Sequence, residues 1–336
     1  MKVIENVFKY QLRIDNIACY SQNNNIYNIY DFNGYLLNSI EVEDCHWFFQ
    51  DEKFLQIGNN GKLGYFSEDV FVKPLLNYYR PIVNNIGVFH DYTNSDGRTH
   101  KEMLFALPEE QQILSEWLPN RIFHVQDQYW ANDTEEDFKL IDVERGKVLW
   151  TIPQPNVEKP YGYNGLTSIK KVLGIYKDCL WLQLPDSRLL VLDIDNGFIK
   201  HELKHDYYIV HERGTFFDSK EGVLKIFFYN LYAKYSLELM DFVEEYDLGI
   251  PELFQATSMI SIPNDKYIYY TAKLNDVSMI SNAYGIFDSE KKEIVFQGEE
   301  IEEGGCFYQE PQVNDELFTI LDAKGNLIIH RLTDIL

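Results

Sequence analysis

Short apolar runs alternate with polar turns along most of the chain. Two such stretches align without a gap: residues 139–152 read KLIDVERGKVLWTI, and residues 190–203 read LVLDIDNGFIKHEL. In each, the first apolar run ends in an aspartate, Asp142 or Asp193, and a glycine follows four positions later. An aspartate side chain can accept hydrogen bonds from the backbone of a turn, and glycine readily adopts a positive φ. Both stretches are therefore predicted to be β-hairpins.

Weaker copies of this pattern recur along the chain, and one of them has a lysine in place of the glycine after Asp288. They lie at residues 26–40, 54–66, 234–248, 284–296 and 318–332. Between them are runs rich in β-branched and aromatic residues, at 122–131, 179–184, 223–230 and 266–273. Such residues favour half-buried strands.

Few segments have a helical pattern. Residues 107–119 (LPEEQQILSEWLP) carry Pro108 near the start, acids in the first turn and Pro119 as a stop, which predicts a helix. The same residues also fit a hairpin that turns at PEEQ. Residues 249–256 fit one short helical turn. Neither segment provides the regular strand–helix alternation of a parallel α/β sheet, so we expect an all-β protein.

The stretch LIDVERGKVLW resembles the repeat of quinoprotein-type and WD40-like β-propellers. The hairpins recur at intervals of roughly 30 to 50 residues, about the size of one four-stranded blade. About eight hairpins are present, and the last could complete the first blade by pairing the N- and C-terminal segments, which closes the ring. The resemblance therefore implies a single β-propeller domain over residues 1–336, preferably of seven blades of about four antiparallel strands. Eight blades are the alternative.

Residues 201–211 read HELKHDYYIVH and match the spacing of a zinc peptidase, with His201, Glu202, His205 and His211 as the candidate residues. On a helix, side chains four apart lie roughly 6 Å from each other and can share one ion. On a strand, the same two residues are about 13 Å apart. The zinc interpretation therefore requires a helix at this segment.

The repeat favours a strand instead. His201 takes the place that Trp150 holds in the aligned stretch, and the segment follows the hairpin turn at Asn196 and Gly197. The glycine that zinc peptidases of this kind need between the second and third histidine is Tyr208 here. We assign no metal site and expect the segment to be extended.

Composition narrows the class of partner. The 336-residue chain has 53 Asp and Glu against 30 Lys and Arg, a net charge of −23. This charge repels nucleic acid and attracts basic proteins. Acidic clusters at 132–137, 241–247 and 298–305 could meet such a partner, or hold paired carboxylates for acid–base chemistry. Residues 91–100 are similar to a calcium loop but lack its first and last carboxylates, so we expect a polar turn.

No other signature of catalysis, export or membrane insertion stands out. The cysteines have no metal-binding or disulfide spacing, and each lies beside apolar residues, as small buried side chains do; they are Cys19, Cys45, Cys179 and Cys306. The N-terminal segment lacks a signal-peptide pattern, and no 18-residue apolar run is present. No nucleophile elbow, P-loop or dinucleotide-binding glycine motif occurs. We expect a soluble, cytoplasmic protein without a cofactor.

Together these features favour a non-catalytic β-propeller that binds a basic protein through an acidic, aromatic surface, with no nucleic-acid or membrane partner. The abundance of Ile, Asn and Tyr is typical of an AT-rich bacterial genome, and one concrete form is a bacterial immunity protein that neutralises a basic toxin. We assign no catalytic, cofactor-binding or metal-binding residues. The alternative is a hydrolase, either a zinc metallopeptidase using residues 201–211 or a propeller enzyme using loop carboxylates.

Overall fold

The chain separates into two compact units that are described one at a time. Unit 1 comprises Met1–Val42 and Ile209–Leu336, and unit 2 comprises Glu43–Tyr208. The computed structural model describes residues 1–21, 26–41, 49–51, 54–57, 62–67, 70–77, 83–91, 101–119, 121–157, 168–204, 211, 213–249, 254–274, 281–298, 306–307 and 309–336, with the backbone alone for 49–77 and 90–91.

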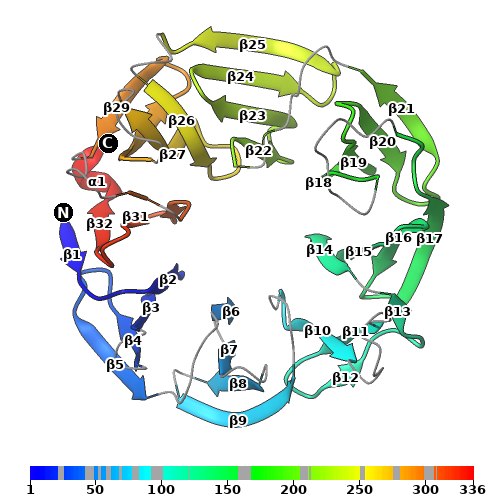
Figure 1. Cartoon of the computed structure of the whole chain (residues 1–336), viewed down its shortest axis with the longest axis horizontal. Helices are drawn as coiled ribbons and strands as arrows, with labels where there is room; N and C mark the ends of the chain where they lie inside the picture. The colour runs from blue at the N-terminus through cyan, green and yellow to red at the C-terminus, as the bar shows by residue number, and fades with distance from the viewer. Residues whose placement is uncertain are drawn as a thin grey trace. The chain divides into compact units, whose positions relative to one another are not determined.

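Unit 1 contains four antiparallel sheets of four strands each among its described residues (Figure 1). The first contains β2 (Lys9–Leu12), β3 (Ile17–Ser21), β4 (Ile26–Tyr30) and β5 (Leu36–Glu41). The second contains β22 (Thr215–Asp218), β23 (Val223–Phe228), β24 (Leu231–Ser236) and β25 (Asp241–Asp247). The third contains β26 (Phe254–Ile260), β27 (Tyr267–Leu274), β28 (Ala283–Asp288) and β29 (Glu293–Gln297). The fourth contains β30 (Gln312–Val313), β31 (Leu317–Leu321), β32 (Leu327–Arg331) and β1 (Lys2–Ile4).

Unit 2 also contains four sheets among its described residues. The first contains β6 (Phe49–Asp51), β7 (Phe54–Ile57), β8 (Lys62–Ser67) and β9 (Val70–Asn77). The second contains β10 (Ile86–Asp91), β11 (Lys101–Ala106), β12 (Gln111–Gln112) and β13 (Leu118–Pro119). The third contains β14 (Ile122–Gln126), β15 (Tyr129–Asp133), β16 (Asp137–Asp142) and β17 (Lys147–Pro153). The fourth contains β18 (Lys171–Tyr176), β19 (Cys179–Gln183), β20 (Leu189–Asp193) and β21 (Ile199–Leu203).

The described strands thus form eight sheets, which corresponds to the alternative of eight blades and not to the preferred seven. Seven of the sheets have four strands in a simple row. In the remaining sheet, β12 and β13 both pair with β11, so its pattern in the sequence is irregular. The preferred count of seven assumed that the last hairpin completes the first blade, but β30, β31 and β32 form a separate sheet with β1.

The helix predicted for residues 107–119 is absent. Gln111 and Gln112 of β12 pair with Ala106 and Phe105, so the chain reverses at 107–110 as the hairpin alternative proposed. Glu110 has a φ of +62°, a left-handed conformation that a turn accepts and a helix does not. In the segment 249–256, the described residues from Phe254 onward belong to strand β26, and residues 250–253 lie outside the described residues.

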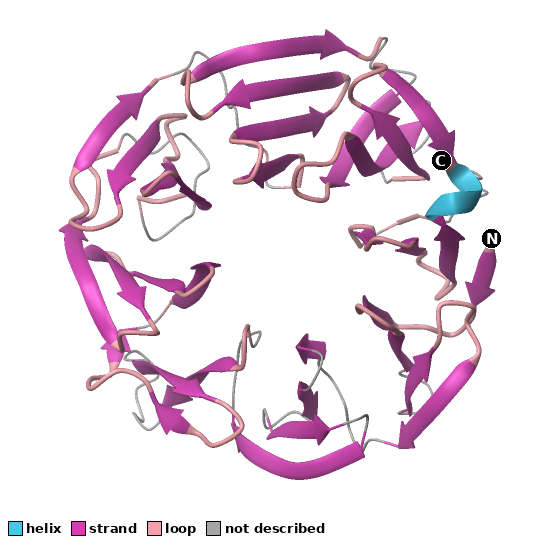
Figure 2. Cartoon of the chain, turned by 180° about the vertical axis from the view of Figure 1, so that it is seen from behind, coloured by secondary structure: helices cyan, strands magenta, loops and turns pink. Residues whose placement is uncertain are grey.

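Strands account for almost all regular structure in the described residues, and the helix there is the four-residue α1 (Leu332–Ile335) (Figure 2). None of the described helices has the length and apolar character needed to span a bilayer. The all-β prediction is confirmed.

The gapless alignment of the two best repeats is confirmed by strand register. Leu140 of β16 pairs with Trp150 of β17, and Val191 of β20 pairs with His201 of β21. Each pair of strands has a bulge immediately after the aligned residue, Leu140 or Val191. The two hairpins therefore have the same strand register and a β-bulge at the same position.

The turn chemistry also follows the prediction. The Oδ1 atom of Asp193 accepts the backbone N–H groups of Asp195 (3.0 Å) and Asn196 (3.2 Å), and Gly197 has a φ of +73°. Asp288 caps its turn in the same way, and Lys292 occupies the glycine position with a φ of +60°. At Gly197 a side chain would also collide with its neighbour, because a Cβ atom there would lie 2.8 Å from the ring of Trp150. These turns are set by local sequence.

The N-terminal strand β1 pairs with β32 and forms the edge of the last sheet of unit 1. Its register places Val3 opposite Ile328. The first segment of the chain therefore completes the sheet formed by the last segment, which is the reverse of the expected donation of C-terminal strands to the first blade. The single closed domain over residues 1–336 remains a prediction.

Aromatic side chains fill the cores between neighbouring sheets. In unit 1, Phe227, Tyr270 and Phe287 are fully buried, with ring centroids of Phe227 at 5.3 Å from Tyr270 and 5.0 Å from Phe287. In unit 2, the indole N–H of Trp150 on β17 donates to the carbonyl of Ile194, 2.7 Å away in the next sheet. Each core therefore joins one sheet to the next, as burial of large aromatic groups favours.

Candidate functional site

The zinc-like motif begins on a strand. His201 and Glu202 both lie on β21, where His201 is exposed. Glu202 pairs with Arg188, whose Nη1 lies 2.6 Å from Glu202 Oε1. This arrangement confirms the extended conformation for residues 199–203 and gives Glu202 a partner other than a metal ion.

The rest of the motif adds no ligand geometry. His211 stacks on Phe228, with ring centroids 4.1 Å apart and an interplanar angle of 18°. His205 lies outside the described residues. Within the described ranges, no group of three His, Cys, Asp or Glu side chains is arranged to hold a metal ion. The assignment of no metal site stays a prediction.

The first acidic cluster, at 132–137, stabilises its own loop. Asp133 is buried, and its Oδ1 accepts a hydrogen bond from Gln154 Nε2 at 2.7 Å. Asp137 Oδ1 accepts bonds from the hydroxyl of Thr134 (2.9 Å) and from Lys139 Nζ (3.0 Å). These contacts indicate a structural role. The cluster at 298–305 beyond Gly298, and residues 92–100 of the calcium-like loop, lie outside the described residues.

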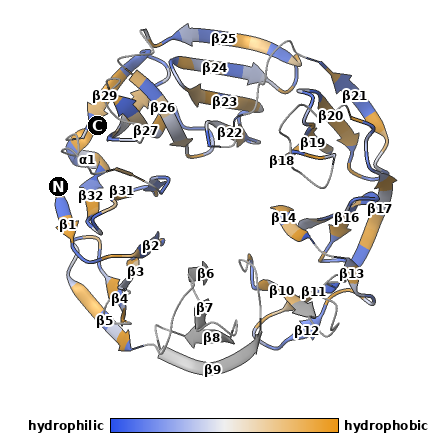
Figure 3. Cartoon of the chain, in the orientation of Figure 1, coloured by the Kyte–Doolittle hydropathy of each residue, from blue (hydrophilic) through white to orange (hydrophobic). Residues whose placement is uncertain are grey.

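The remaining cluster forms an exposed strip on β25, the last strand of its sheet. We define the acidic strip as residues 238–247 (ELMDFVEEYD), which contain five Asp or Glu and no Lys or Arg. Three large apolar side chains of the strip are also exposed: Leu239 (70%), Val243 (50%) and Tyr246 (39%). Figure 3 shows hydrophilic and hydrophobic segments alternating along β25.

Local structure explains why Val243 faces solvent. Phe242 packs edge-on against Tyr235, with centroids 5.3 Å apart, and holds one side of the strand to the sheet. The register then shifts between Lys234 and Tyr235, which makes Val243 an extra residue on β25. A bulge re-aims side chains of the strand that contains it. Val243 is thereby half-exposed among carboxylates.

The strip continues onto the neighbouring sheet. Lys292, in the turn before β29, forms an ion pair with Glu244 of β25 and lies over the ring of Tyr232, 4.5 Å from its centroid. Ile294 on β29 is 38% exposed. The last strands of the other described sheets are less acidic: β5 carries one acid, and β21 carries Lys200 beside His201 and Glu202.

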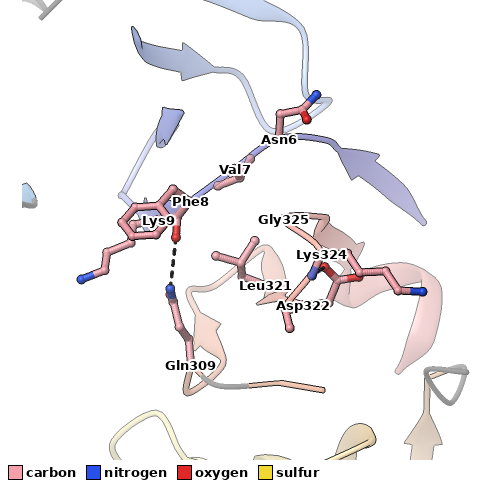
Figure 4. Close-up of a pocket in the computed structure, with 10 residues that line it drawn as sticks. Asn6, Val7, Phe8, Lys9, Gln309, Leu321, Asp322, Lys324 and Gly325 are labelled. Atoms are coloured by element: carbon pink, nitrogen blue, oxygen red, sulfur yellow. Dashed lines mark hydrogen bonds between the residues drawn. The ribbon is translucent and has the colours of Figure 1, made fainter. Parts of the chain in front are cut away.

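A separate groove lies in unit 1 between the β1–β2 connection and the β31–β32 turn (Figure 4). Its volume is about 420 Å³, and it is lined by Asn6, Val7, Phe8, Lys9, Gln309 and residues 321–325. Val7 N–H donates to the Gly325 carbonyl at 2.9 Å, and Phe8 is 44% exposed. The carboxylate of Asp322 is engaged by its own turn, through the N–H groups of Lys324 and Asn326. The groove can receive a side chain of a partner but presents no acid–base pair.

A buried ionic network ties two sheets of unit 1 together. Lys225 and Asp218 are both fully buried, and Lys225 Nζ lies 2.9 Å from Asp218 Oδ2 and 3.1 Å from Glu221 Oε2. The same ammonium group donates to the Asp265 carbonyl of the next sheet at 2.6 Å. Burial opposes ionisation of Asp218, but backbone N–H groups of Glu221 and Asn264 and the charge of Lys225 hold its pKa below the usual value.

His330 is the second buried ionisable group of note. It lies between aromatic rings, and its Nε2 is 2.9 Å from the hydroxyl of Tyr284. Burial, with a smaller contribution from the N-terminal ammonium group, lowers the pKa of His330 to about 4. It is therefore neutral at pH 7. Sequence reasoning missed both buried groups, although Asp218 followed by Gly222 repeats the Asp–Gly turn signal and could have marked the first of them.

Comparison with solved structures identifies the fold of the chain. No family model matches the sequence, and no curated protein matches it. Solved structures match over nearly the whole chain. The C-terminal WD40 domain of Sif2 has a TM-score of 0.62 at 10% identity and covers 98% of this chain and 97% of its own. Sqt1 of Saccharomyces cerevisiae has a TM-score of 0.58 at 11% identity, with 98% and 97% covered.

BamB from Moraxella catarrhalis is similar at a TM-score of 0.56 and 11% identity, with 98% of this chain and 96% of that chain covered. A computationally designed protein, Ika8, has a TM-score of 0.60 at 10% identity, with 98% and 96% covered. The chain has a β-propeller fold, as its repeat predicts. At these identities the likeness defines the fold alone.

Proposed function

We propose that this protein is a non-catalytic β-propeller that binds a basic protein partner through the acidic strip. The observation that carries the proposal is the combination, on strand β25 and the turn before it, of five carboxylates with exposed Leu239, Val243 and Tyr246. WD40 domains are among the structures that match this fold.

The two components of the strip have different roles in binding. Apolar and aromatic groups that become desolvated provide most of the energy of a protein interface, and tyrosine is frequent among such groups. Carboxylates around them attract a cationic partner, accelerate association and disfavour acidic competitors. Carboxylates alone would also serve solubility, so the exposed apolar side chains are what favour an interface.

A bacterial immunity protein is the concrete form that we propose for this function. Such a protein needs no catalytic group, and an acidic surface complements a basic toxin. The net charge of −23 supports this complementarity. The zinc-peptidase form of the hydrolase alternative requires a helix at 201–205, and residues Ile199–Leu203 form a strand. The form that uses loop carboxylates stays an alternative.

The test is affinity capture with a charge-reversed strip. Tagged protein is incubated with extract of the source organism at about 0.05 M and about 0.5 M salt, because screening at the higher value weakens exposed charge pairs. The strip variant is Asp241→Lys with Glu245→Lys. The matched control is Glu135→Lys with Glu136→Lys, which makes the same charge change at two exposed residues of unit 2.

We expect a basic protein to bind the wild type and the control at low salt, and to be lost from the strip variant. A partner that binds the strip variant as well as the wild type, or binding that does not change with salt, would contradict the proposal.

A further inference from the structure

The outer strand of the first sheet of unit 1 has an exposed apolar edge. This strand, β5, pairs with β4 alone in the described part of the chain. Its side chains Leu36 and Leu37 are 56% and 60% exposed, and Tyr35, immediately before it, is exposed as well. Figure 3 shows hydrophobic stretches along β5. The backbone groups on the outer side of an edge strand can pair with a further strand.

Strand β5 has few of the residues that normally prevent edge-to-edge pairing, which are charged side chains, especially lysine, and proline. Its sequence, LLNSIE, has one charge, at the last residue, Glu41. Other outer strands are better protected: β9 and β17 each contain a lysine and a proline, β21 contains a lysine, and β25 contains four acids. Strand β29 also has a single acid, but its exposed apolar residue, Ile294, is only 38% exposed.

Two cations lie at the start of this edge. Lys2 Nζ on β1 lies 4.1 Å from the centroid of the Tyr35 ring, and Arg331 Nη2 donates to Asn33 Oδ1 at 2.6 Å. The same turn holds the carboxylate of Asp31, whose Oδ1 accepts the N–H groups of Asn33 (2.9 Å) and Tyr35 (2.7 Å). The start of the edge therefore brings together two cations and one carboxylate, whereas its other end carries an acid.

A second copy of this edge is complementary to the first. In an antiparallel pair about a two-fold axis at Asn38, Leu36 lies opposite Ile40 of the second copy. Glu41 then lies opposite Tyr35 of the second copy, beside the two cations. Apolar pairs and opposite charges across neighbouring strands stabilise a sheet, and each contact occurs twice in a two-fold interface. An unrelated partner would have to reproduce both features, which a second copy provides by symmetry.

We propose that this protein forms a two-fold dimer by antiparallel pairing of β5 with β5 of a second copy. The β-bulge of β5 lies at Leu37, and residues 38–41 pair with residues 29–26 of β4 in regular register. This regular part of the edge is where the second copy pairs. The net charge of −23 makes two copies repel each other, but physiological salt screens distant charges. The dimer edge lies on a different sheet from the acidic strip, and the dimer is independent of the proposed function.

The experiment is sedimentation velocity of the full chain at about 0.15 M salt and about 1 to 200 µM protein, a range that covers the affinity of a small interface. The edge variant is Leu36→Glu. The matched control is Ile199→Glu, because Ile199 is 55% exposed on β21, the outer strand of another sheet. Both variants change the net charge equally, and far-UV circular dichroism compares their folding with that of the wild type.

Two charge variants test the register. Glu41→Lys places a lysine beside Lys2 of the second copy and should weaken the dimer. The double variant Glu41→Lys with Lys2→Glu exchanges the two charges and keeps the net charge of the wild type. It should restore the dimer, because each glutamate again meets a lysine across the interface.

We expect the wild type and Ile199→Glu to form monomer–dimer mixtures with the same dissociation constant. Leu36→Glu should raise this constant about tenfold or more, and Glu41→Lys about threefold or more, with recovery in the double variant. The proposal is overturned if the wild type is monomeric at all concentrations, if species larger than a dimer form, if Leu36→Glu dimerises as well as Ile199→Glu, or if the double variant does not recover. The strip variant Asp241→Lys with Glu245→Lys should still dimerise, which separates this test from that of the proposed function.

Discussion

Removal of the buried lysine in unit 1 gives the sharpest test of how two neighbouring sheets are held together. The perturbation is Lys225→Met, which keeps most of the side-chain volume and deletes the charge. The Lys225 ammonium group is fully buried and contacts Asp218 Oδ2 (2.9 Å), Glu221 Oε2 (3.1 Å) and the Asp265 carbonyl (2.6 Å). The substitution therefore leaves a fully buried carboxylate without its cation.

The magnitude follows from what Asp218 retains. Removing one partner of a buried ion pair costs about 3 to 5 kcal/mol. Backbone N–H groups of Glu221 (3.0 Å to Oδ1) and Asn264 (2.6 Å to Oδ2) still donate to Asp218 in the variant. Because these bonds offset part of the loss, we expect a decrease of about 3 kcal/mol in the free energy of unfolding, at the lower end of that range.

The assay is urea unfolding at pH 7 followed by far-UV circular dichroism and tryptophan fluorescence, with the double variant Lys225→Met/Asp218→Asn as the matched comparison. The double variant removes both charges and should recover at least half of the loss, since no unpaired charge remains buried. A decrease of less than about 1 kcal/mol in the single variant, or a double variant that is less stable than the single one, would refute this reasoning.

Four further outcomes follow from the structure. Since burial lowers the pKa of His330 from 6.5 to about 4, the native state favours the neutral ring. Above pH 6.5 the ring is neutral in both the native and the unfolded state, and stability is highest. As the pH falls from 6.5 toward 4, the unfolded state takes up a proton that the native state does not, and the native state loses stability. The variant His330→Gln should remove about 2 kcal/mol of this loss, after allowance for screening. Gly197→Ala should lower the free energy of unfolding by about 3 kcal/mol for two reasons. The new Cβ atom would lie 2.8 Å from the ring of Trp150, and alanine would have to adopt a φ of +73°. Gly249→Ala, with a φ of +107° and no neighbour within 4 Å, should cost only about 1 to 2 kcal/mol in the same denaturation assay. Finally, purified protein should contain no stoichiometric zinc by elemental analysis, and His201→Ala should not change the metal content; zinc that is present and lost in the variant would contradict the strand-based interpretation.

The hairpins could be predicted from the sequence because their determinants are local. The Asp and Gly positions around 142–146 and 193–197 fix the turns, and the alternation of the flanking residues fixes the strands. Even the register of the two best repeats, with Trp150 equivalent to His201, was readable from a gapless alignment. The same equivalence predicted the strand at residues 199–203, against the short-range resemblance to a zinc motif.

Other features depend on contacts between distant segments and could not be predicted in this way. Residues 107–119 fit both a helix and a hairpin, and the pairing of β12 and β13 with β11 that decides between them is not revealed by the local pattern. The number of sheets was underestimated because the last hairpin was expected to complete the first blade, whereas β30, β31 and β32 form a separate sheet with β1. The contact between Lys225 and the carbonyl of Asp265 joins residues forty positions apart.

The candidate surface was only partly visible in the sequence. All three acidic clusters had similar composition, yet Asp133 is buried and bonded within its own loop, whereas residues 241–247 form the last strand of their sheet. What distinguishes the strip is the bulge that exposes Val243 beside the carboxylates. That distinction requires the register of β24 and β25.

Hydrogen exchange of the protein alone and in complex with its captured basic partner tests the central claim most directly. Binding should slow exchange of the backbone amides of residues 238–247, with no change over residues 132–137. Protection confined to other segments, with residues 238–247 exchanging at the same rate in both states, would contradict the account.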